Sequence, residues 1–155
     1  MRCFLHHTKN PEQVIKKAIN HLNKNGILIC MEPILSSFYA YPSIPEIEKA
    51  LNLYIKLGEK KGLDFDIGKK LYGYMQTKQN LENFQAFIYK GIGINNFEKS
   101  WIEMITTECA TRYIEEGMIT AVEIDNILNR ITEHINKTSV IATLPEFVCI
   151  TAKKV

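Results

Sequence analysis

Two adjacent imidazoles and one carboxylate are the side chains best suited to chemistry in this sequence. His6 and His7 follow a short apolar segment, and Glu32 follows the apolar run 27–31. A neutral imidazole, with a pKa near ~6.5, can accept a proton from a hydroxyl or an amine. A carboxylate can orient or deprotonate a nucleophile. The same residues also suit a structural role, in which the imidazoles hydrogen-bond the local turn and Glu32 caps the segment that follows.

The segments around these residues predict a strand, a helix and a second strand. Asn10 suits the N-cap of a helix, Pro11 its first position and Gln13 its third. The run 26–31 is apolar without interruption, which is typical of a strand buried on both faces, as in a parallel sheet. Both strands of such a βαβ unit end at one edge of the sheet, where open α/β sheets bind ligands. We therefore expect the two imidazoles and the carboxylate to lie near one another. The helix between the strands carries one apolar stripe: Val14, Ile15, Ala18, Ile19 and Leu22.

The rest of the chain predicts mainly helices. Ser43 and Glu46 form a capping box with Pro45 in the first turn, which predicts a helix that runs to about Lys61. The glycine pair within 91–93 follows a strand rather than opening a helix, so we expect a turn there. The other expected elements are a short helix capped by Asp66, a strand over 84–89, a helix over 97–116 that stops at Gly117, a helix from the capping box of Thr120 and Glu123 to about Ile135, and a strand over 147–150.

The composition argues against several classes of protein. The chain has 155 residues, 46% apolar and 23% charged, which fits one domain with a substantial core and excludes wholesale disorder. A net charge of +2 with scattered lysines gives no concentrated basic surface for nucleic acid. No apolar run approaches the ~20 residues of a membrane helix and no signal peptide is found, so we expect a soluble, cytoplasmic protein with no membrane partner. The four cysteines have no ligand spacing, which favours free thiols over a disulfide or a metal site.

Five segments match, in order, the motifs of one protein family. Residues 4–12 (FLHHTKNPE) have the pattern hydrophobic-His-x-x-Asn-Pro-Glu, and residues 21–29 (HLNKNGILI) correspond to a Leu-Lys-Pro-Gly-Gly turn that leads into a strand. A Glu-Pro pair follows at 32–33, and residues 62–71 (GLDFDIGKKL) are similar to GGDPDIGRRL. Trp101 and residues 115–120 (EEGMIT) match a helical pair with an EAGLIT turn. The chain thus resembles the carboxy-terminal half of a class I, Rossmann-like methyltransferase that depends on S-adenosylmethionine, in the branch that methylates small molecules.

The resemblance implies a fold and residue roles. Residues 1–155 would form a single carboxy-terminal portion of an α/β, Rossmann-like methyltransferase domain. It would span the end of the fourth strand through an antiparallel seventh strand, with a helical substrate-lid insertion. The cofactor would be S-adenosylmethionine, with Arg2, Cys3 and Phe4 at its methionine end, and His7 matches the family's histidine. The family's glycine-rich GxGxG loop and ribose-binding acidic residue precede the fourth strand, and this sequence has neither.

The implied function is transfer of a methyl group to an oxygen or nitrogen of a small-molecule acceptor. The two imidazoles and Glu32 are the catalytic candidates. Phe38, Tyr39 and Tyr41 would form a lid over an apolar substrate, because lids exclude water from a reaction, or else an aromatic cluster under a loop. Methyl transfer asks mainly for alignment of the reacting groups, so the reaction does not need a conspicuous catalytic dyad.

Two other interpretations stay open. The first is a non-catalytic, methyltransferase-like fragment that acts as an oligomeric or interaction module. A sheet cut at its fourth strand leaves an unpaired apolar edge, which favours a homo-oligomer or a missing amino-terminal half. The second is an unrelated helical α/β interaction module, in which the run 27–31 would not be a central parallel strand flanked by the opening strand.

Overall fold

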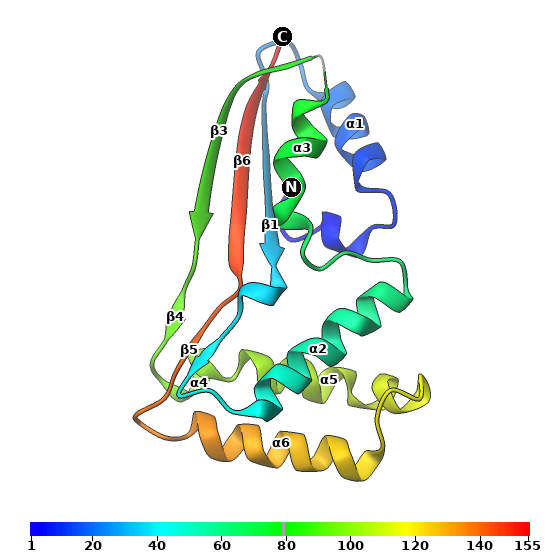
Figure 1. Cartoon of the computed structure of the whole chain (residues 1–155). Helices are drawn as coiled ribbons and strands as arrows, with labels where there is room; N and C mark the ends of the chain where they lie inside the picture. Colours follow the sequence, from blue (N-terminus) through cyan, green and yellow to red (C-terminus); the bar gives the residue numbers. More distant parts are fainter. Residues whose placement is uncertain (79) are drawn as a thin grey trace. The chain divides into compact units, whose positions relative to one another are not determined.

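The computed structural model of the protein describes residues 1–78 and 80–155 (Figure 1). The chain folds into two compact units. The sheet unit comprises Met1–Leu35, Gly62–Tyr89 and Glu146–Val155, and the helical unit comprises Ser36–Lys61 and Lys90–Pro145. Both units contain helices and strands, which confirms the mixed α/β class expected from the sequence. That the chain is a single portion of one larger domain stays a prediction.

The sheet unit is built on strands β1 (Ile27–Ile34), β6 (Glu146–Lys154) and β3 (Leu81–Tyr89), in the order β1-β6-β3. β6 runs antiparallel to both neighbours, so β1 and β3 point the same way. On the other side of β1, Arg2 adds one parallel bridge to Met31. The last strand is therefore antiparallel, as expected. The predicted opening strand is wrong, because of the opening residues only Arg2 forms a bridge to β1 and the chain turns into η1 at Leu5. The unit also contains η1 (Leu5–His7), α1 (Pro11–His21), η3 (Ile67–Lys69) and α3 (Leu71–Gln76).

Over residues 27–31, β1 is buried on one face only, so the prediction that this run is buried on both faces is wrong. Leu28 and Cys30 are 5% and 0% exposed, whereas Ile27 and Ile29 are 63% and 51% exposed. The physical reason is that α1 and α3 lie on the same side of the sheet (Figure 1). An apolar run shows that a strand tolerates burial on both faces, but the number of helices available to cover the sheet decides whether it occurs.

The core of the sheet unit lies between the sheet and its two helices. α1 begins as predicted: Asn10 Oδ1 accepts a hydrogen bond of 3.1 Å from the N–H of Gln13, and Pro11 holds the first helical position. β1 continues through Pro33 to Ile34, beyond the end predicted at the Glu-Pro pair. The core consists of Leu5, Ile15, Ile19, Leu28, Cys30, Ile67, Leu71, Met75, Leu81, Ile150 and Ala152.

The helical unit packs its helices with a small antiparallel sheet. The helices are α2 (Pro45–Lys60), α4 (Asn96–Lys99), α5 (Trp101–Glu115) and α6 (Ala121–Ile135). The strands β2 (Ala40–Tyr41), β5 (Ile141–Thr143) and β4 (Ile92–Gly93) pair in the order β2-β5-β4, and η2 (Leu35–Ser37) spans the junction of the two units. Within the described residues, no helix is long and apolar enough to cross a membrane. The core includes Phe38, Ile47, Ala50, Leu51, Ile102, Ile127, Ile131 and Ile135, with a second cluster of Leu57, Tyr113 and Ile124.

Capping contacts show which predicted helix starts are right. Thr120 and Glu123 form the predicted capping box of α6: the N–H of Glu123 donates to Thr120 Oγ1 over 3.3 Å, and the N–H of Thr120 donates to Glu123 Oε2 over 3.0 Å. The box predicted for Ser43 and Glu46 is wrong. Ile44 precedes α2 and no side chain caps it, because the helix begins one residue later than that box requires.

Two further predictions change in the second half of the helical unit. The single helix predicted over 97–116 is interrupted at Ser100, which divides it into α4 and α5. Asn95 and Glu98 form an unforeseen capping box at the start of α4. The turn predicted over 91–93 is wrong, because strand β4 pairs with β5 there.

Candidate functional site

Glu32 lies on the covered face of β1, with its side chain completely buried. Its carboxylate binds the turn that leads into η1. Oε1 accepts hydrogen bonds from the N–H groups of Phe4 and Leu5, over 2.9 and 2.8 Å. Oε2 accepts from the N–H of His6 over 3.3 Å and lies 2.7 Å from its Nδ1. The first N–H groups of a helix have no partner within it, so Glu32 satisfies donors that would otherwise be buried and unpaired.

The same carboxylate sets the tautomer of His6. Burial by itself would raise the pKa of Glu32, but the hydrogen bonds from His6 and from the backbone of Leu5 and Phe4 outweigh it and hold the pKa below its ordinary value. An ionised carboxylate only accepts hydrogen bonds, so Nδ1 of His6 carries a proton. In the neutral ring, Nε2 then holds the lone pair and can accept a proton. Glu32 thus orients His6 as a carboxylate orients a basic imidazole in general acid–base sites.

His7 lies beside His6 on the exposed side of this turn. The two ring centroids are 3.9 Å apart, at an interplanar angle of 44°. Phe65 meets both rings edge-on, with centroid distances of 5.8 Å to His6 and 6.1 Å to His7. Partial burial and then the neighbouring His6 lower the pKa of His7, against a smaller opposing effect of Glu32. His7 is therefore predominantly neutral at pH 7 and can act as a base.

Sequence analysis does not identify Phe65, although it contacts both imidazoles. Phe65 precedes η3, is 7% exposed, and its carbonyl oxygen accepts a hydrogen bond of 3.2 Å from the N–H of Leu35. Gly68 lets η3 approach β1 closely: a Cβ there would lie 2.8 Å from the carbonyl oxygen of Pro33 and 2.9 Å from that of Glu32. The Asp-Ile-Gly of the matched segment 62–71 was the available signal, since a glycine between apolar residues can mark a close backbone approach.

The residues predicted to bind the cofactor lie in the same turn. Cys3 has a left-handed backbone with φ of 48°, and burial raises the pKa of its thiol, with Glu32 adding to the effect. The ring of Phe4 is 50% exposed, and Arg2 is exposed. The N–H groups of residues 3–5 all donate to Glu32 or to a carbonyl of β1. These N–H groups therefore already have acceptors within the protein, and contact of this turn with S-adenosylmethionine stays a prediction.

The predicted substrate lid belongs to the helical unit. Phe38 is 6% exposed, and its ring centroid lies 5.4 Å from that of Trp101. Tyr39 is half exposed, with Lys90 Nζ 4.8 Å from its ring centroid, and Tyr41 is exposed on β2. Phe38 is thus packed as a core residue, whereas Tyr39 and Tyr41 offer ring surface to a ligand. Contact of the three with a substrate stays a prediction.

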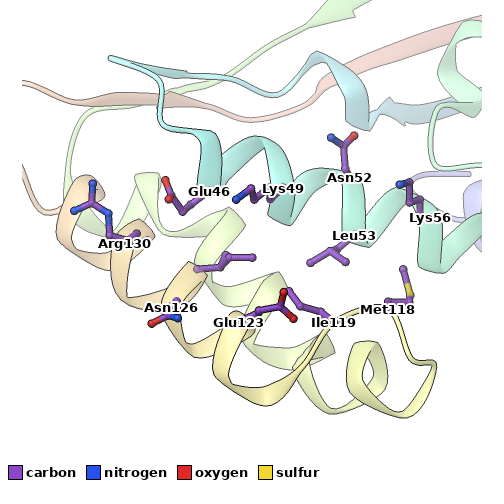
Figure 2. Close-up of a pocket in the computed structure, with 11 residues that line it drawn as sticks. Glu46, Lys49, Asn52, Leu53, Lys56, Met118, Ile119, Glu123, Asn126 and Arg130 are labelled. Carbon is purple, nitrogen blue, oxygen red and sulfur yellow. The ribbon is translucent and has the colours of Figure 1, made fainter.

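A cavity of about 530 Å³ lies within the helical unit, between α2 and α6 (Figure 2). No predicted site residue lines it. Arg130 pairs with Glu133 over 2.8 Å, and hydrogen bonds from Thr120 lower the pKa of Glu123, so several of its charges already serve contacts within the unit. Its described lining has no imidazole or thiol, and we therefore place the candidate site at Glu32. The lining side chains are Glu46, Lys49, Asn52, Leu53, Lys56, Met118, Ile119, Glu123, Asn126, Ile127 and Arg130.

The structure thus brings His6, His7 and Glu32 together, as expected from the strand ends, and adds Phe65 to them. In the described part of the chain, no cluster of His, Cys, Asp and Glu side chains is arranged to hold a metal ion. Comparison with known proteins finds no family model that matches the chain and no curated protein with significant similarity to it.

Proposed function

We propose that the chain is part of an S-adenosylmethionine-dependent methyltransferase that transfers a methyl group to an oxygen or nitrogen of a small molecule. The observation that carries the proposal is the buried Glu32 carboxylate, 2.7 Å from His6 Nδ1 and beside the exposed His7. When bound, S-adenosylmethionine supplies a methyl group already activated on a sulfonium, and its sulfur keeps the electron pair of the broken bond. The protein then has to align the acceptor and take its proton.

The chain's own groups suit that proton transfer. An acceptor O–H or N–H that is hydrogen-bonded to a neutral imidazole can pass its proton to the ring nitrogen while its lone pair forms the new bond to carbon. His7 is the exposed imidazole, and the lowering of its pKa keeps it neutral. His6 has the carboxylate of Glu32 behind it, which binds Nδ1 and fixes the orientation of the ring. Phe65 limits the motion of both rings.

The strand directions also support the proposal. The last strand, β6, is antiparallel, which is what the resemblance implies for the final strand of the domain. Arg2 pairs in parallel with Met31, so β1 lies between the opening residues and β6. β1 is, however, an edge strand of an antiparallel sheet and has only this one bridge on its other side, as an unrelated interaction module would also allow.

Calorimetric titration of S-adenosylmethionine, and of its demethylated product, into the 155-residue chain tests the proposal. We expect binding, and transfer of labelled methyl groups to phenolic or amine acceptors that His7→Gln slows, because the amide cannot take the proton of the acceptor. His21→Gln is the matched control, because His21 is also an exposed histidine but lies at the end of α1. A Kd above about 1 mM would contradict the claim that this chain alone is an active enzyme.

The alternative is a non-catalytic fragment that acts as an oligomeric or interaction module. The large apolar side chains exposed on the sheet, such as Ile27 at 63% and Ile29 at 51%, favour it. This alternative predicts that the same titration shows no binding of cofactor or product.

A further inference from the structure

The helices α1 and α3 lie on one side of the sheet (Figure 1). The opposite side carries exposed apolar side chains. Side chains alternate along a strand, so these residues point opposite to the buried residues of the same strands. The register joins them across the sheet, since Met31 pairs with Cys149 and Cys149 with Phe87. We call this surface the outer face. It comprises Ile27, Ile29 and Met31 of β1, Phe147, Cys149 and Thr151 of β6, and Gln85, Phe87 and Tyr89 of β3, with Lys153 and Glu82 at one end.

Four exposed side chains of the outer face supply a large part of the apolar surface that an interface needs. Ile27, Ile29, Phe87 and Tyr89 are 63%, 51%, 56% and 58% exposed. At ~200 Å² for a large apolar side chain, these four expose roughly 450 Å², more than half of the ~800 Å² that one partner buries in a standard protein interface. A contiguous apolar surface of this size on a soluble protein commonly has a binding role.

The distribution of charge favours a second copy of the chain as the occupant. The described residues in the rows of the outer face from Ile29 on β1 to Tyr89 on β3 are uncharged. The charged side chains lie in the row at one end, where Lys153 Nζ is 4.0 Å from Glu82 Oε1. Such a face has no charge with which to select a partner of opposite charge, and two copies meet there without repulsion. We propose that two copies of this chain pack their outer faces together about a two-fold axis.

This arrangement makes a specific geometric prediction. Apolar faces of two sheets pack ~10 Å apart with their strands nearly aligned. β6 is the central strand, and Cys149 lies in a middle row of the outer face. In a two-fold contact, a residue near the axis faces its own counterpart, so the two Cys149 side chains come close together. The inference does not depend on methyl transfer, because it uses no residue of the Glu32 site.

Analytical ultracentrifugation of the full chain over a range of concentrations tests the interface. We expect a dimer with twice the 17.8 kDa mass of the chain. Phe87→Glu, and separately Ile29→Glu on the other edge, should raise the Kd of the dimer at least ~10-fold, because each buries an unpaired carboxylate. Val122→Glu is the matched control: Val122 is 71% exposed on α6, outside the outer face, and its substitution should leave the Kd unchanged.

Circular dichroism shows whether each variant keeps its fold, which we expect because the substituted side chains are exposed. A wild-type chain that stays monomeric at about 100 μM overturns the proposal. So do folded Phe87→Glu and Ile29→Glu variants that dimerise as tightly as the wild type.

Crosslinking then identifies the face. A bismaleimide with a reach of ~10 Å should join two wild-type chains, and Cys149→Ser should abolish the product. Cys109→Ser is the control, because Cys109 is a half-buried free cysteine on α5 and should not affect the yield. Persistence of the dimeric product in Cys149→Ser would mean that another surface joins the two copies, which overturns the proposal.

Discussion

Both units of the molecule bury a histidine, and the two rings are bonded to different kinds of acceptor. His6 in the sheet unit and His134 in the helical unit are 8% and 6% exposed. His6 Nδ1 lies 2.7 Å from the Glu32 carboxylate, whereas His134 Nε2 lies 2.6 Å from the carbonyl oxygen of Pro42. A carbonyl holds a ring in place, but a carboxylate also stabilises the cation formed when the ring takes a proton. Two equally buried histidines can therefore differ in chemistry, because their hydrogen-bond acceptors differ in charge.

The largest predicted difference between the two units is in the stability lost when one partner of each histidine's hydrogen bond is removed. Glu32→Ala leaves the N–H groups of Phe4, Leu5 and His6 without their acceptor, and we expect it to lower the free energy of unfolding of the sheet unit by ~3–5 kcal/mol. His134→Ala removes one hydrogen bond to a carbonyl and some packing, which should cost ~1–2 kcal/mol. Native-state amide hydrogen exchange, read separately for each unit, measures both losses. Equal losses would remove the distinction between the two histidines.

The next largest effect concerns the close approach that holds Phe65 against the imidazoles. Gly68→Ala would put a Cβ within 3 Å of two carbonyl oxygens of β1, and we expect a destabilisation of ~1–3 kcal/mol. Gly73→Ala is the matched control, because Gly73 lies in α3 with no atom within 4 Å of an added Cβ. It should stabilise the fold by ~0.5–1 kcal/mol. Denaturant unfolding compares the two, and a neutral Gly68→Ala would argue that η3 does not constrain the site.

The pH dependence of stability tests the charge of Glu32. The pKa of Glu32 in the fold lies below its ordinary value, so its contribution is complete above the unfolded pKa of ~4.3 and is lost as the pH falls through the lower, folded value. Denaturant unfolding at a series of acidic pH values should show the stability of the sheet unit falling in that window. Glu32→Gln should flatten this dependence and His134→Phe should keep it. A wild-type slope in Glu32→Gln would show that Glu32 is not the group being protonated.

The smallest effect is on the pKa of His7, measured by NMR titration. Burial is the main cause of its low pKa, and the charges of its neighbours adjust it in opposite directions. His6→Asn should raise the pKa of His7 toward ~6.5, and Glu32→Gln should lower it further. His134→Phe is the control and should leave it unchanged. Because the folded pKa is depressed, the stabilising contribution of neutral His7 is present above ~6.5 and is lost as the pH falls. Shifts of the same sign in His6→Asn and Glu32→Gln would contradict the geometry.

The helix starts that sequence analysis predicts correctly depend on nearest neighbours. Asn10 and Thr120 each bond a backbone N–H three residues ahead, so the signal is contained in four consecutive residues. Ser43 is not the N-cap although its motif is complete. A proline is compatible with either of the first two helical positions, so both Ser43 and Ile44 could precede the helix, and the packed structure selects Ile44. Local patterns thus indicate that a helix exists more reliably than they indicate where it begins.

The site is predictable only where strand ends imply proximity. The first strand of the predicted βαβ unit is reduced to one parallel bridge between Arg2 and Met31, but this bridge still brings the imidazoles to Glu32. The partners of Glu32 are backbone groups 26 to 28 residues away, and Phe65 arrives from another segment altogether. Such contacts depend on how the elements pack, and residue type and spacing do not encode them. The one-sided burial of β1 escapes prediction for the same reason.

The strand order has a consequence for synthesis on the ribosome. Among the described strands, β1 and β3 pair with β6 alone, and β6 lies later in the chain than every other described element. The only other pairing of β1 among the described residues is its single bridge to Arg2. While β6 is still untranslated, the two earlier strands of the nascent sheet unit have no partner in the sheet, whereas every helix and strand of the helical unit has already been made. The helical unit can therefore fold first. Until β6 is made, β1 and β3 keep their apolar side chains and strand edges exposed, and chaperones bind such surfaces.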